Sequence, residues 1–174
     1  LFMIRDGDEI LDAALAARDY KIIDPVTLYL CETTPLRPAS LPRAQSYCIW
    51  EPLHIMREIW AAGGIQEPRI ALMHRVQTPK TALLARSGDT PAGVGFLALD
   101  GEIAMLHAVE VLPSYRRRGV AKKLMAQAAK WAEDHGAKYM ALMTTRDNQA
   151  ANRLYSSLGM RPVGHYHYRI KDTA

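Results

Sequence analysis

Cysteine and long apolar runs are scarce in this sequence, and each shortage excludes a kind of protein. Cys31 and Cys48 are the two cysteines, too few for a disulfide framework or a cysteine-rich metal site, so we expect reduced thiols and no metal. No apolar run approaches the roughly 20 residues that span a bilayer. No basic-then-apolar signal pattern opens the chain. We therefore expect a soluble, cytoplasmic protein with no membrane partner.

The charge of the chain is also modest. Its formal net charge is +4, charged residues make up 23% of the 174 residues, and both signs are mixed along the chain. This argues against a disordered or polyionic protein and gives little support to a nucleic-acid binder. With 49% apolar residues, the length suits one substantial domain. The chain begins at Leu1 and not at a methionine, which allows for a truncated N-terminus.

The N-terminal part of the sequence predicts one helix, two short strands and a linker. Apolar residues at helical spacing, an acidic start and a basic end predict a helix over 8–18. Residues 20–32 read as two short strands separated at Asp24-Pro25. Residues 34–46 hold three prolines and no apolar period, which indicates a linker.

The remainder predicts a sheet with helices. A helix over 52–64, with an apolar stripe and a glycine pair at its end, precedes a second helix or irregular segment and then an antiparallel meander. A long helix, a strand, a shorter helix and one or two final strands follow. Their order indicates an α+β or mixed α/β fold. The expected ranges are 81–86, 92–99 and 103–112 for the meander, then 120–135, 138–145, 148–158 and 160–170.

A basic run at 111–123, VLPSYRRRGVAKK, joins the third meander strand to the long helix. Pro113 cannot donate to a sheet ladder and so ends the strand, and Gly119 lets the backbone turn sharply close to a ligand. The helix that follows presents free N–H groups and a partial positive charge at its N-terminus. Strand, glycine turn and helix focus donors on one point, which suits a pyrophosphate better than a duplex backbone.

Three elements together resemble the GNAT-type N-acetyltransferases. RRRGVA at 116–121 fits the R/Q-x-x-G-x-G/A loop that binds the pyrophosphate of acetyl-CoA in that family, and the preceding LHAVEVLPSYR resembles the family's fourth strand. NQAANRLYSSLGM at 148–160 resembles the second signature, whose last position is usually phenylalanine. The resemblance covers about residues 50–170. It implies a GNAT-like acyl-CoA N-acyltransferase fold, with a central, twisted, mostly antiparallel sheet flanked by helices.

The resemblance implies acetyl-CoA as cosubstrate and no metal. In the family the pantetheine arm inserts between the strands that correspond to 103–112 and 138–145, where backbone groups of residues 109–111 would bond it. The N–H groups of residues 117–122 would hold the pyrophosphate. The expected cofactor-binding residues are Val109, Glu110, Val111, Arg116, Arg117, Arg118, Gly119, Val120, Ala121, Lys122, Asn148 and Tyr155.

Two residues are candidates for catalysis of acyl transfer from a thioester to an amine. Tyr155 would donate to the departing thiolate, because a phenol is protonated at neutral pH; simple packing of its ring is the alternative. Some family members use a glutamate on the fifth strand, where this sequence has Met143. Glu110 is therefore the expected general base, directly or through water, unless solvent takes the proton. His107 lies three residues earlier, so strand alternation predicts it on the opposite face, as a core residue.

The sequence thus predicts an N-acetyltransferase that moves an acetyl group from acetyl-CoA to a primary amine of a small molecule, a protein or a peptide. A non-catalytic acyl-CoA binding or regulatory module is the alternative. A nucleic-acid binder that uses the arginines is a third interpretation, and it predicts steep salt dependence. The tail HYHYR at 165–169 indicates sheet packing or the lining of an acceptor pocket. A homodimer is one assembly that we keep open.

A weak internal repeat bears on the N-terminal segment. Residues 11–23 and 151–163 share the order helix, tight break and short strand at an offset of 140. One interpretation makes 1–33 the remnant of a degenerate acetyltransferase half, joined by a linker at 34–47 to a GNAT-type domain at 48–174, as in tandem members of the family. Alanine or leucine stands where the catalytic tyrosine would be, so that half would be inactive. A generic helix and strand packed on the domain is the other interpretation.

Overall fold

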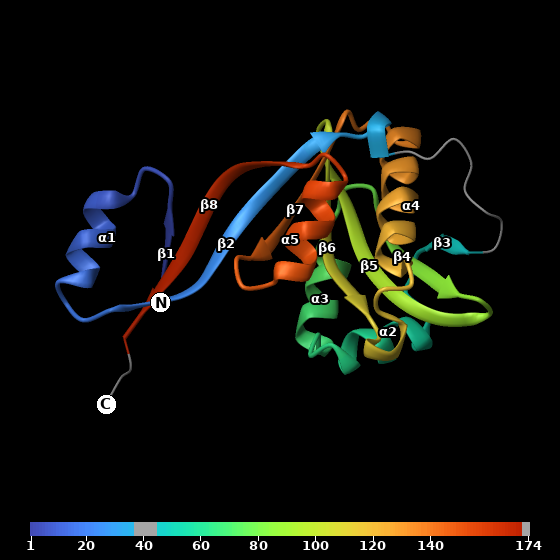
Figure 1. Ribbon diagram of the computed structural model, residues 1–174, viewed down its shortest axis with the longest axis horizontal. Helices are drawn as coiled ribbons and strands as arrows, with labels where there is room; N and C mark the ends of the chain where they lie inside the picture. The colour runs from blue at the N-terminus through green and yellow to red at the C-terminus, as the bar shows by residue number, and fades with distance from the viewer. Residues whose placement is uncertain (37–44, 172–174) are drawn as a thin grey trace. The chain divides into compact units, whose positions relative to one another are not determined.

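The computed structural model describes residues 1–36 and 45–171 and divides the chain into two compact units. Unit 1 consists of Leu1–Leu30 and Leu142–Ala174, and unit 2 of Cys31–Ala141. Figure 1 labels the elements. In chain order they are β1 (Phe2–Arg5), α1 (Glu9–Ala16), β2 (Lys21–Glu32), the short helix η1 (Thr34–Leu36), β3 (Ser46–Ile49), α2 (His54–Ala62), α3 (Glu67–Arg75), β4 (Lys80–Ser87), β5 (Thr90–Asp100), β6 (Ile103–Val111), η2 (Pro113–Tyr115), α4 (Val120–Asp134), β7 (Tyr139–Thr145), α5 (Gln149–Ser157) and β8 (Arg161–Ile170).

Four strands of unit 2 form an antiparallel run in the order β3-β4-β5-β6. Two-residue connections join β4 to β5 and β5 to β6, as the predicted meander requires. Alternate residues of β5 point to opposite faces. Val94 and Phe96 join the cluster under α2 and α3. Gly93 faces α4, because a Cβ built on it would lie 2.7 Å from Val120 Cγ1. Helices therefore cover both faces of this run.

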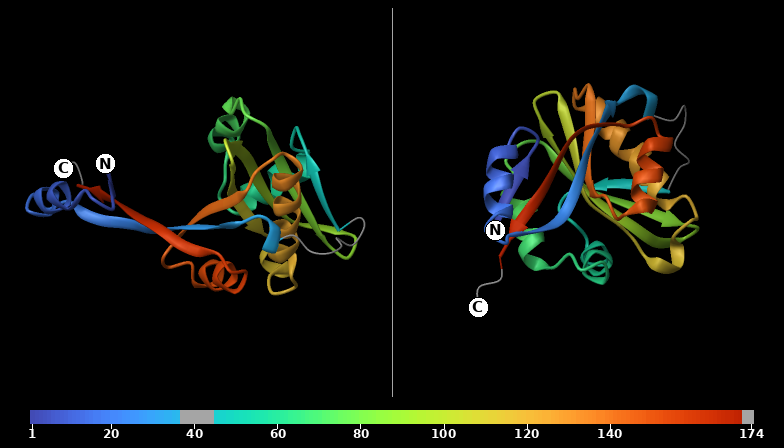
Figure 2. Two further views of the ribbon diagram at one scale, coloured as in Figure 1. Left: turned by 90° about the horizontal axis from the view of Figure 1, so that it is seen from above. Right: turned by 60° about the vertical axis from the view of Figure 1, so that its left-hand side comes forward.

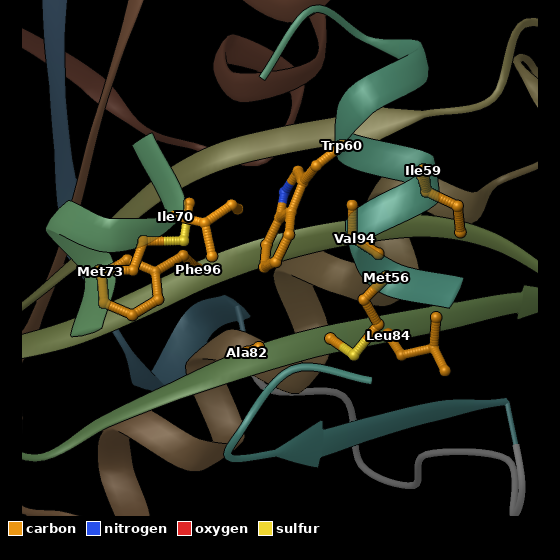
Figure 3. Close-up of a cluster of buried hydrophobic side chains, with 9 residues drawn as sticks. All are labelled: Met56, Ile59, Trp60, Ile70, Met73, Ala82, Leu84, Val94 and Phe96. Carbon is orange, nitrogen blue, oxygen red and sulfur yellow. The ribbon is translucent and has the colours of Figure 1, made fainter. Parts of the chain in front are cut away.

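The core of unit 2 lies between α2, α3 and one face of β4 and β5 (Figure 3). Apolar residues at helical spacing on α2 and α3 meet apolar residues at alternate positions of the two strands. Burial of such side chains, at roughly 25 cal/mol per Å² of apolar surface, holds both helices on the sheet. The cluster consists of Met56, Ile59, Trp60, Ile70, Met73, Ala82, Leu84, Val94 and Phe96.

Unit 1 has β8 between β1 and β2, antiparallel to both. β7 follows β2 on its other side, and the N–H of Arg146, just after β7, donates to the Pro25 carbonyl oxygen at 2.7 Å. Both views of Figure 2 show β2 and β8 running side by side. The pairing of β2 with β8 therefore joins the N-terminal and C-terminal segments of this unit.

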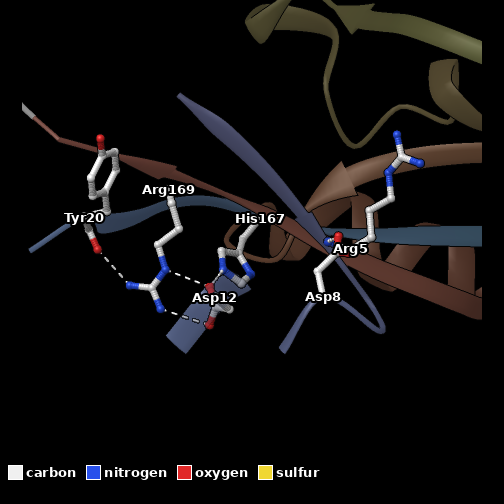
Figure 4. Close-up of polar contacts among 6 residues, drawn as sticks. All are labelled: Arg5, Asp8, Asp12, Tyr20, His167 and Arg169. Atoms are coloured by element: carbon white, nitrogen blue, oxygen red, sulfur yellow. Dashed lines mark hydrogen bonds and ion pairs between the residues drawn. The ribbon is translucent and has the colours of Figure 1, made fainter. Parts of the chain in front are cut away.

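One carboxylate, that of Asp12 on α1, ties its helix to β8 (Figure 4). Arg169 donates from Nε to Asp12 Oδ1 at 2.7 Å and from Nη2 to Oδ2 at 3.0 Å. His167 Nε2 lies 2.8 Å from Asp12 Oδ1, and Arg169 Nη1 also donates to the Tyr20 carbonyl oxygen at 2.8 Å. The hydrogen bonds to Asp12, those from Arg169 first, lower the pKa of this carboxyl to about 2.

The predicted α+β class, with mostly antiparallel strands, is confirmed. The expected break at Asp24-Pro25 is wrong, because β2 is a single strand. Its register shifts between Ile23 and Val26, and a bulge of this kind accommodates a proline, which has no N–H for the ladder. The four-residue strands β1 and β3 went unpredicted, since so short a segment carries no clear period.

The predicted linker at 34–46 is structured at both ends. Thr34–Leu36 form η1 and Ser46 begins β3, while residues 37–44 lie outside the described part of the chain. The division of the chain into 1–33, 34–47 and 48–174 stays a prediction.

Neither a membrane-spanning helix nor a metal-binding cluster occurs in the described part of the chain. No helix there is long and apolar enough to cross a membrane. No group of three or more His, Cys, Asp or Glu side chains in that part of the chain could hold a metal ion. The thiols of Cys31 and Cys48 are free, and burial raises the pKa of Cys31 to about 11. The Cys31 thiol therefore stays protonated at neutral pH and is a poor nucleophile.

Because Asp12 is stabilised in its charged form by Arg169, we expect the folded protein to lose stability in acid. The folded-state pKa lies below the ordinary 3.8, so the contact stabilises the fold fully above that value and progressively less as the pH falls toward about 2. We expect Asp12→Asn to lower the melting temperature at neutral pH and to flatten its pH dependence in this range. Thermal unfolding followed by circular dichroism measures both. Parallel pH profiles for the two proteins would contradict this prediction.

Candidate functional site

The end of β6 departs from regular strand geometry at Ala108, which has a left-handed φ of +51°. The ladder partners shift here. Phe96 pairs with His107, and two residues back along β5, Val94 pairs with Glu110. Three steps of β6 thus match two of β5, as in a β-bulge. His107 and Glu110 therefore lie on the same face of the sheet, and their predicted placement on opposite faces is wrong.

The indole of Trp60 holds this bulge in place. Its Nε1 donates to the Ala108 carbonyl oxygen at 2.7 Å, and the Trp60 side chain on α2 is fully buried. A buried indole N–H needs an acceptor, and a bulge disrupts the ladder so that a carbonyl oxygen can accept from a side chain. The two groups satisfy each other, which fixes the direction of the last residues of β6.

Gly63, the residue after α2, leaves room for the side chain of Glu110. A Cβ built on Gly63 would lie 2.4 Å from both Glu110 Cγ and Cδ and 2.5 Å from Oε2. No real Cβ atom tolerates such contacts, so glycine is required while Glu110 keeps this position. The Glu110 side chain is 18% exposed. A carboxylate with so little access to water needs charged or hydrogen-bonding partners.

Arg116 and the backbone of Val111 supply those partners. Arg116 Nη2 and the Val111 N–H both donate to Glu110 Oε1 at 3.2 Å. Arg116 Nε donates to the Val111 carbonyl oxygen at 3.1 Å. Arg116 is 58% exposed, so its ion pair contributes little stability by itself. It instead orients the carboxylate, and the Val111 N–H that we predicted for the pantetheine arm is bonded to Glu110.

The turn into α4 presents a row of free backbone donors. Gly119 precedes the helix with φ +77°, and a Cβ built there would meet no atom within 4 Å, so the space beside it is open. Among the described residues, the N–H groups of 117–122 donate to no other backbone group. The first helical bond runs from the Lys123 N–H to the Gly119 carbonyl oxygen at 3.1 Å. Free donors at the positive end of a 15-residue helix are a candidate anion site.

The basic side chains around this turn differ in their partners. Arg118 lies over the Tyr115 ring, with 5.4 Å between the guanidinium carbon and the ring centroid. Lys123 Nζ is bonded to the Arg86 carbonyl oxygen at 3.0 Å and so is held against β4. The exposed residues at the turn are Arg116, Arg117, Arg118, Gly119 and Lys122. The half-buried ones are Val109, Glu110, Val111 and Ala121, and Val120 is buried. Exposed positive charge therefore lies around the backbone donors.

Unit 1 carries the second group of predicted residues, on α5. Asn148 caps this helix, since its Oδ1 accepts from the Ala151 N–H at 3.1 Å. Tyr155, two turns on, is 6% exposed. Burial raises the pKa of Tyr155 to about 12. The phenol therefore keeps its proton throughout the neutral range and can donate a hydrogen bond.

The histidines have structural surroundings. Burial, with a smaller effect of Arg69, lowers the pKa of His107, which favours a neutral imidazole. In the HYHYR tail the N–H of His165 donates to Asp6 Oδ2 at 2.8 Å, and His167 contacts Asp12. The tail thus takes part in the packing of unit 1, and His165, Tyr166, His167 and Arg169 also line a cavity of this unit. Its lining of an acceptor pocket stays a prediction.

Sequence reasoning missed two residues that shape the end of β6. The pair Gly63-Gly64 was interpreted only as a helix end, and Trp60 as part of an amphipathic stripe. A tryptophan in a helical stripe gives no sign of an acceptor 48 residues away. A glycine at a helix end gives no sign that a carboxylate will approach it.

Comparisons with known proteins agree with these features. The model of the acetyltransferase (GNAT) family matches residues 48–160. The uncharacterized N-acetyltransferase YobR of Bacillus subtilis is 26% identical over 100 residues, which are 58% of this chain and 40% of that protein. An aminoglycoside N(6')-acetyltransferase type 1 of Salmonella typhimurium is 37% identical over 57 residues, which are 33% of this chain and 39% of that protein.

A solved structure agrees as well. A GCN5-related N-acetyltransferase from Kribbella flavida has a TM-score of 0.70 over 98% of this chain and 68% of that chain, at 20% identity. The predicted GNAT-like fold is therefore confirmed. Because the family match covers more than half of the sequence, the chain belongs to the GNAT acetyltransferase family. It spans about two fifths of the length of the two curated relatives.

The close approach of Glu110 to Gly63 predicts what a methyl group added at position 63 would do to the Glu110 carboxylate. Gly63→Ala should displace the Glu110 carboxylate and break its bond to Arg116, because the new Cβ would occupy the same space. A crystal structure of the variant measures this. Gly64→Ala is the matched control, since a Cβ there meets no atom within 4 Å although its φ of +84° also strains alanine. An unmoved Glu110 in Gly63→Ala would contradict the prediction.

Proposed function

We propose that this protein is an N-acetyltransferase that moves an acetyl group from acetyl-CoA to a primary amine. The observation that carries the proposal is the row of free N–H groups at 117–122, on a glycine turn at the start of α4, inside the region that matches the family. The anionic oxygens of a pyrophosphate suit such a row. We assign Gly119, Val120 and Ala121 to its backbone cradle, with Arg117, Arg118 and Lys122 as surrounding charge.

We assign the pantetheine arm to backbone groups of Val109, Glu110 and Val111. The Val111 N–H donates to Glu110 Oε1 in the free protein, so binding of the arm would exchange an intramolecular hydrogen bond for an intermolecular one. Arg116 bonds the same carboxylate oxygen and the Val111 carbonyl oxygen. It would hold Glu110 while the Val111 N–H changes its partner.

Acyl transfer forms a C–N bond to the acetyl carbon as the C–S bond breaks, so a proton must leave the amine and the thiolate must be stabilised. We assign proton acceptance to Glu110. Its Oε1 is fixed by Arg116 and Val111, whereas its Oε2 has no hydrogen-bond partner in the described part of the chain. That oxygen would take the proton directly or through water.

We assign stabilisation of the thiolate to Tyr155. Its raised pKa of about 12 makes the phenol a donor that stays protonated beside a leaving thiol, whose ordinary pKa is about 8.5. Asn148, which caps the same helix, is proposed to contact the cofactor.

The acceptor is proposed to be an amine of a small molecule, a protein or a peptide. The name of the Salmonella typhimurium relative supports a small polar amine as the first to test. We place the reaction in the cytoplasm, with which two free thiols agree. A homodimer stays a prediction that analytical ultracentrifugation can check.

Thiol release from acetyl-CoA with a panel of aminoglycosides, polyamines and peptides tests the activity. We expect turnover on one of these amines, and Tyr155→Phe should lower kcat roughly a hundredfold while KM for acetyl-CoA changes little, because the ring keeps its packing. Tyr139→Phe, at an exposed tyrosine of β7, is the control. Tight acetyl-CoA binding without turnover on any amine would instead favour a non-catalytic acyl-CoA binding module.

The pH dependence of a Glu110→Gln variant tests the base. An amide cannot take a proton, so kcat/KM should fall roughly a hundredfold at neutral pH. The deficit should narrow as the pH rises, because more of the amine is then already neutral. Glu67→Gln, at an exposed carboxylate paired with Arg57, should match the unmodified protein. If Glu110→Gln is as active as the parent, solvent takes the proton and Glu110 is not the base.

A further inference from the structure

Unit 1 consists of two segments whose elements correspond at a constant offset of 140 residues. β1, α1 and β2 match β7, α5 and β8 in order, within the segments Leu1–Leu30 and Leu142–Ala174. The residues before the two helices, Asp8 and Asn148, differ by this offset. The correspondence therefore extends over the described length of both segments and not only over the repeat visible in the sequence.

The ends of the two helices have the same backbone geometry. Asp19 and Gly159, which also differ by 140, both have a left-handed φ, of +63° and +80°. The N–H of the next residue then donates back to the helix, to the carbonyl oxygen of Leu15 in α1 and of Tyr155 in α5, each at 3.1 Å. The same helix termination therefore occurs twice.

The pairing of β2 with β8 maps onto itself under the same offset. Lys21 pairs with Ile170, and Leu30 pairs with Arg161. The offset turns Lys21 into Arg161 and Ile170 into Leu30, so one pair becomes the other. The two segments are thus related by a pseudo-two-fold axis.

Each helix contacts the strand of the other segment at an equivalent place. On α1, Asp12 accepts from Arg169 of β8. On α5, Asn152 Oδ1 accepts from the Tyr29 hydroxyl of β2 at 2.8 Å. Asp12 corresponds to Asn152, and Tyr29 corresponds to Arg169. The same helix-to-strand contact is therefore an ion pair in one segment and a hydrogen bond between uncharged side chains in the other.

The two segments of unit 1 differ at the position of Tyr155, to which we assign a catalytic role. Leu15 and Tyr155 correspond, and both are 6% exposed. Leucine therefore performs the packing of this position in the N-terminal copy. The Tyr155 hydroxyl has no hydrogen-bond partner among the described residues, and Leu15 reaches the same burial without a hydroxyl. This internal comparison weakens the alternative that Tyr155 is only a core residue.

We infer that Tyr29 and Asn152 are positioning residues for Tyr155, an inference that rests on the role proposed for Tyr155. The ring of Tyr29 lies 5.8 Å from that of Tyr155, and its hydroxyl is held by Asn152. Asn152 is itself fixed, because its Nδ2 donates to the carbonyl oxygens of Thr145 and Asn148 at 3.0 and 2.8 Å. The N-terminal strand β2 thus supplies a wall of the site built on α5.

A double-mutant cycle on the full chain tests the inference. Tyr29→Phe removes the bond to Asn152 but keeps the ring, and we expect kcat to fall about tenfold with KM for acetyl-CoA unchanged. In a Tyr155→Phe background the same change should have no further effect on kcat, because Tyr29 acts through the Tyr155 hydroxyl. A merely structural role would lower kcat equally in both backgrounds, and that result would overturn the inference.

The equivalent contact supplies the matched control. Asp12→Asn weakens the counterpart bond to Arg169, so it should lower the melting temperature while kcat stays unchanged. If kcat falls equally in Asp12→Asn, the effect of Tyr29→Phe comes from a general loss of stability of unit 1. That result would overturn the inference. Tyr155→Leu should melt near the parent protein, because Leu15 fills the equivalent position. Unfolding of Tyr155→Leu would overturn the internal comparison.

The outcomes separate this inference from the proposed function. A slow Tyr155→Phe variant together with a fully active Tyr29→Phe variant would overturn the positioning role alone. A fully active Tyr155→Phe variant would overturn the role of Tyr155 and the positioning role with it, while turnover itself would still establish the acetyltransferase.

Discussion

One hydrogen bond, from the Trp60 indole to the Ala108 carbonyl oxygen, fixes the geometry on which the candidate site depends. It holds a left-handed residue in β6 and so shifts the alternation of the strand. Without that shift Glu110 would leave the face on which Gly63 makes room for it. The same shift sets the direction in which Val111 leads into the turn before α4. A core side chain thus determines where the polar groups of the site lie.

The candidate anion site is built from backbone groups, and the basic side chains around it have a supporting part. The N–H groups at 117–122 donate to no other backbone group among the described residues, because a glycine turn meets a helix start there. Arg116, the first arginine of the run, bonds Glu110 and the Val111 carbonyl oxygen. It orients the site and does not simply add charge beside a phosphate. Lys123 is likewise committed to a carbonyl oxygen of β4.

The two segments of unit 1 share one backbone arrangement but have different side chains at equivalent positions. The starts of the helices, their ends and the strand pairing recur at an offset of 140, so these features do not distinguish the two segments. A leucine in one and a tyrosine in the other fill the same buried position. The polar contact beside it is an ion pair in the first and a tyrosine–asparagine bond in the second. The function that we propose for this unit depends on a few substituted side chains.

Local patterns in the sequence were enough for the α+β class, the meander, the glycine turn and the family, because each depends on residues close in the chain. The continuous β2 and the common face of His107 and Glu110 were not predictable, since bulges depend on the partner strand. Nor were the bonds of Trp60 and Tyr29, which join residues 48 and 123 positions apart. The sequence by itself determined the longer helices, the meander and the glycine turn that we propose as an anion site. Only the tertiary structure decided which face each side chain occupies, because that depends on contacts between distant segments.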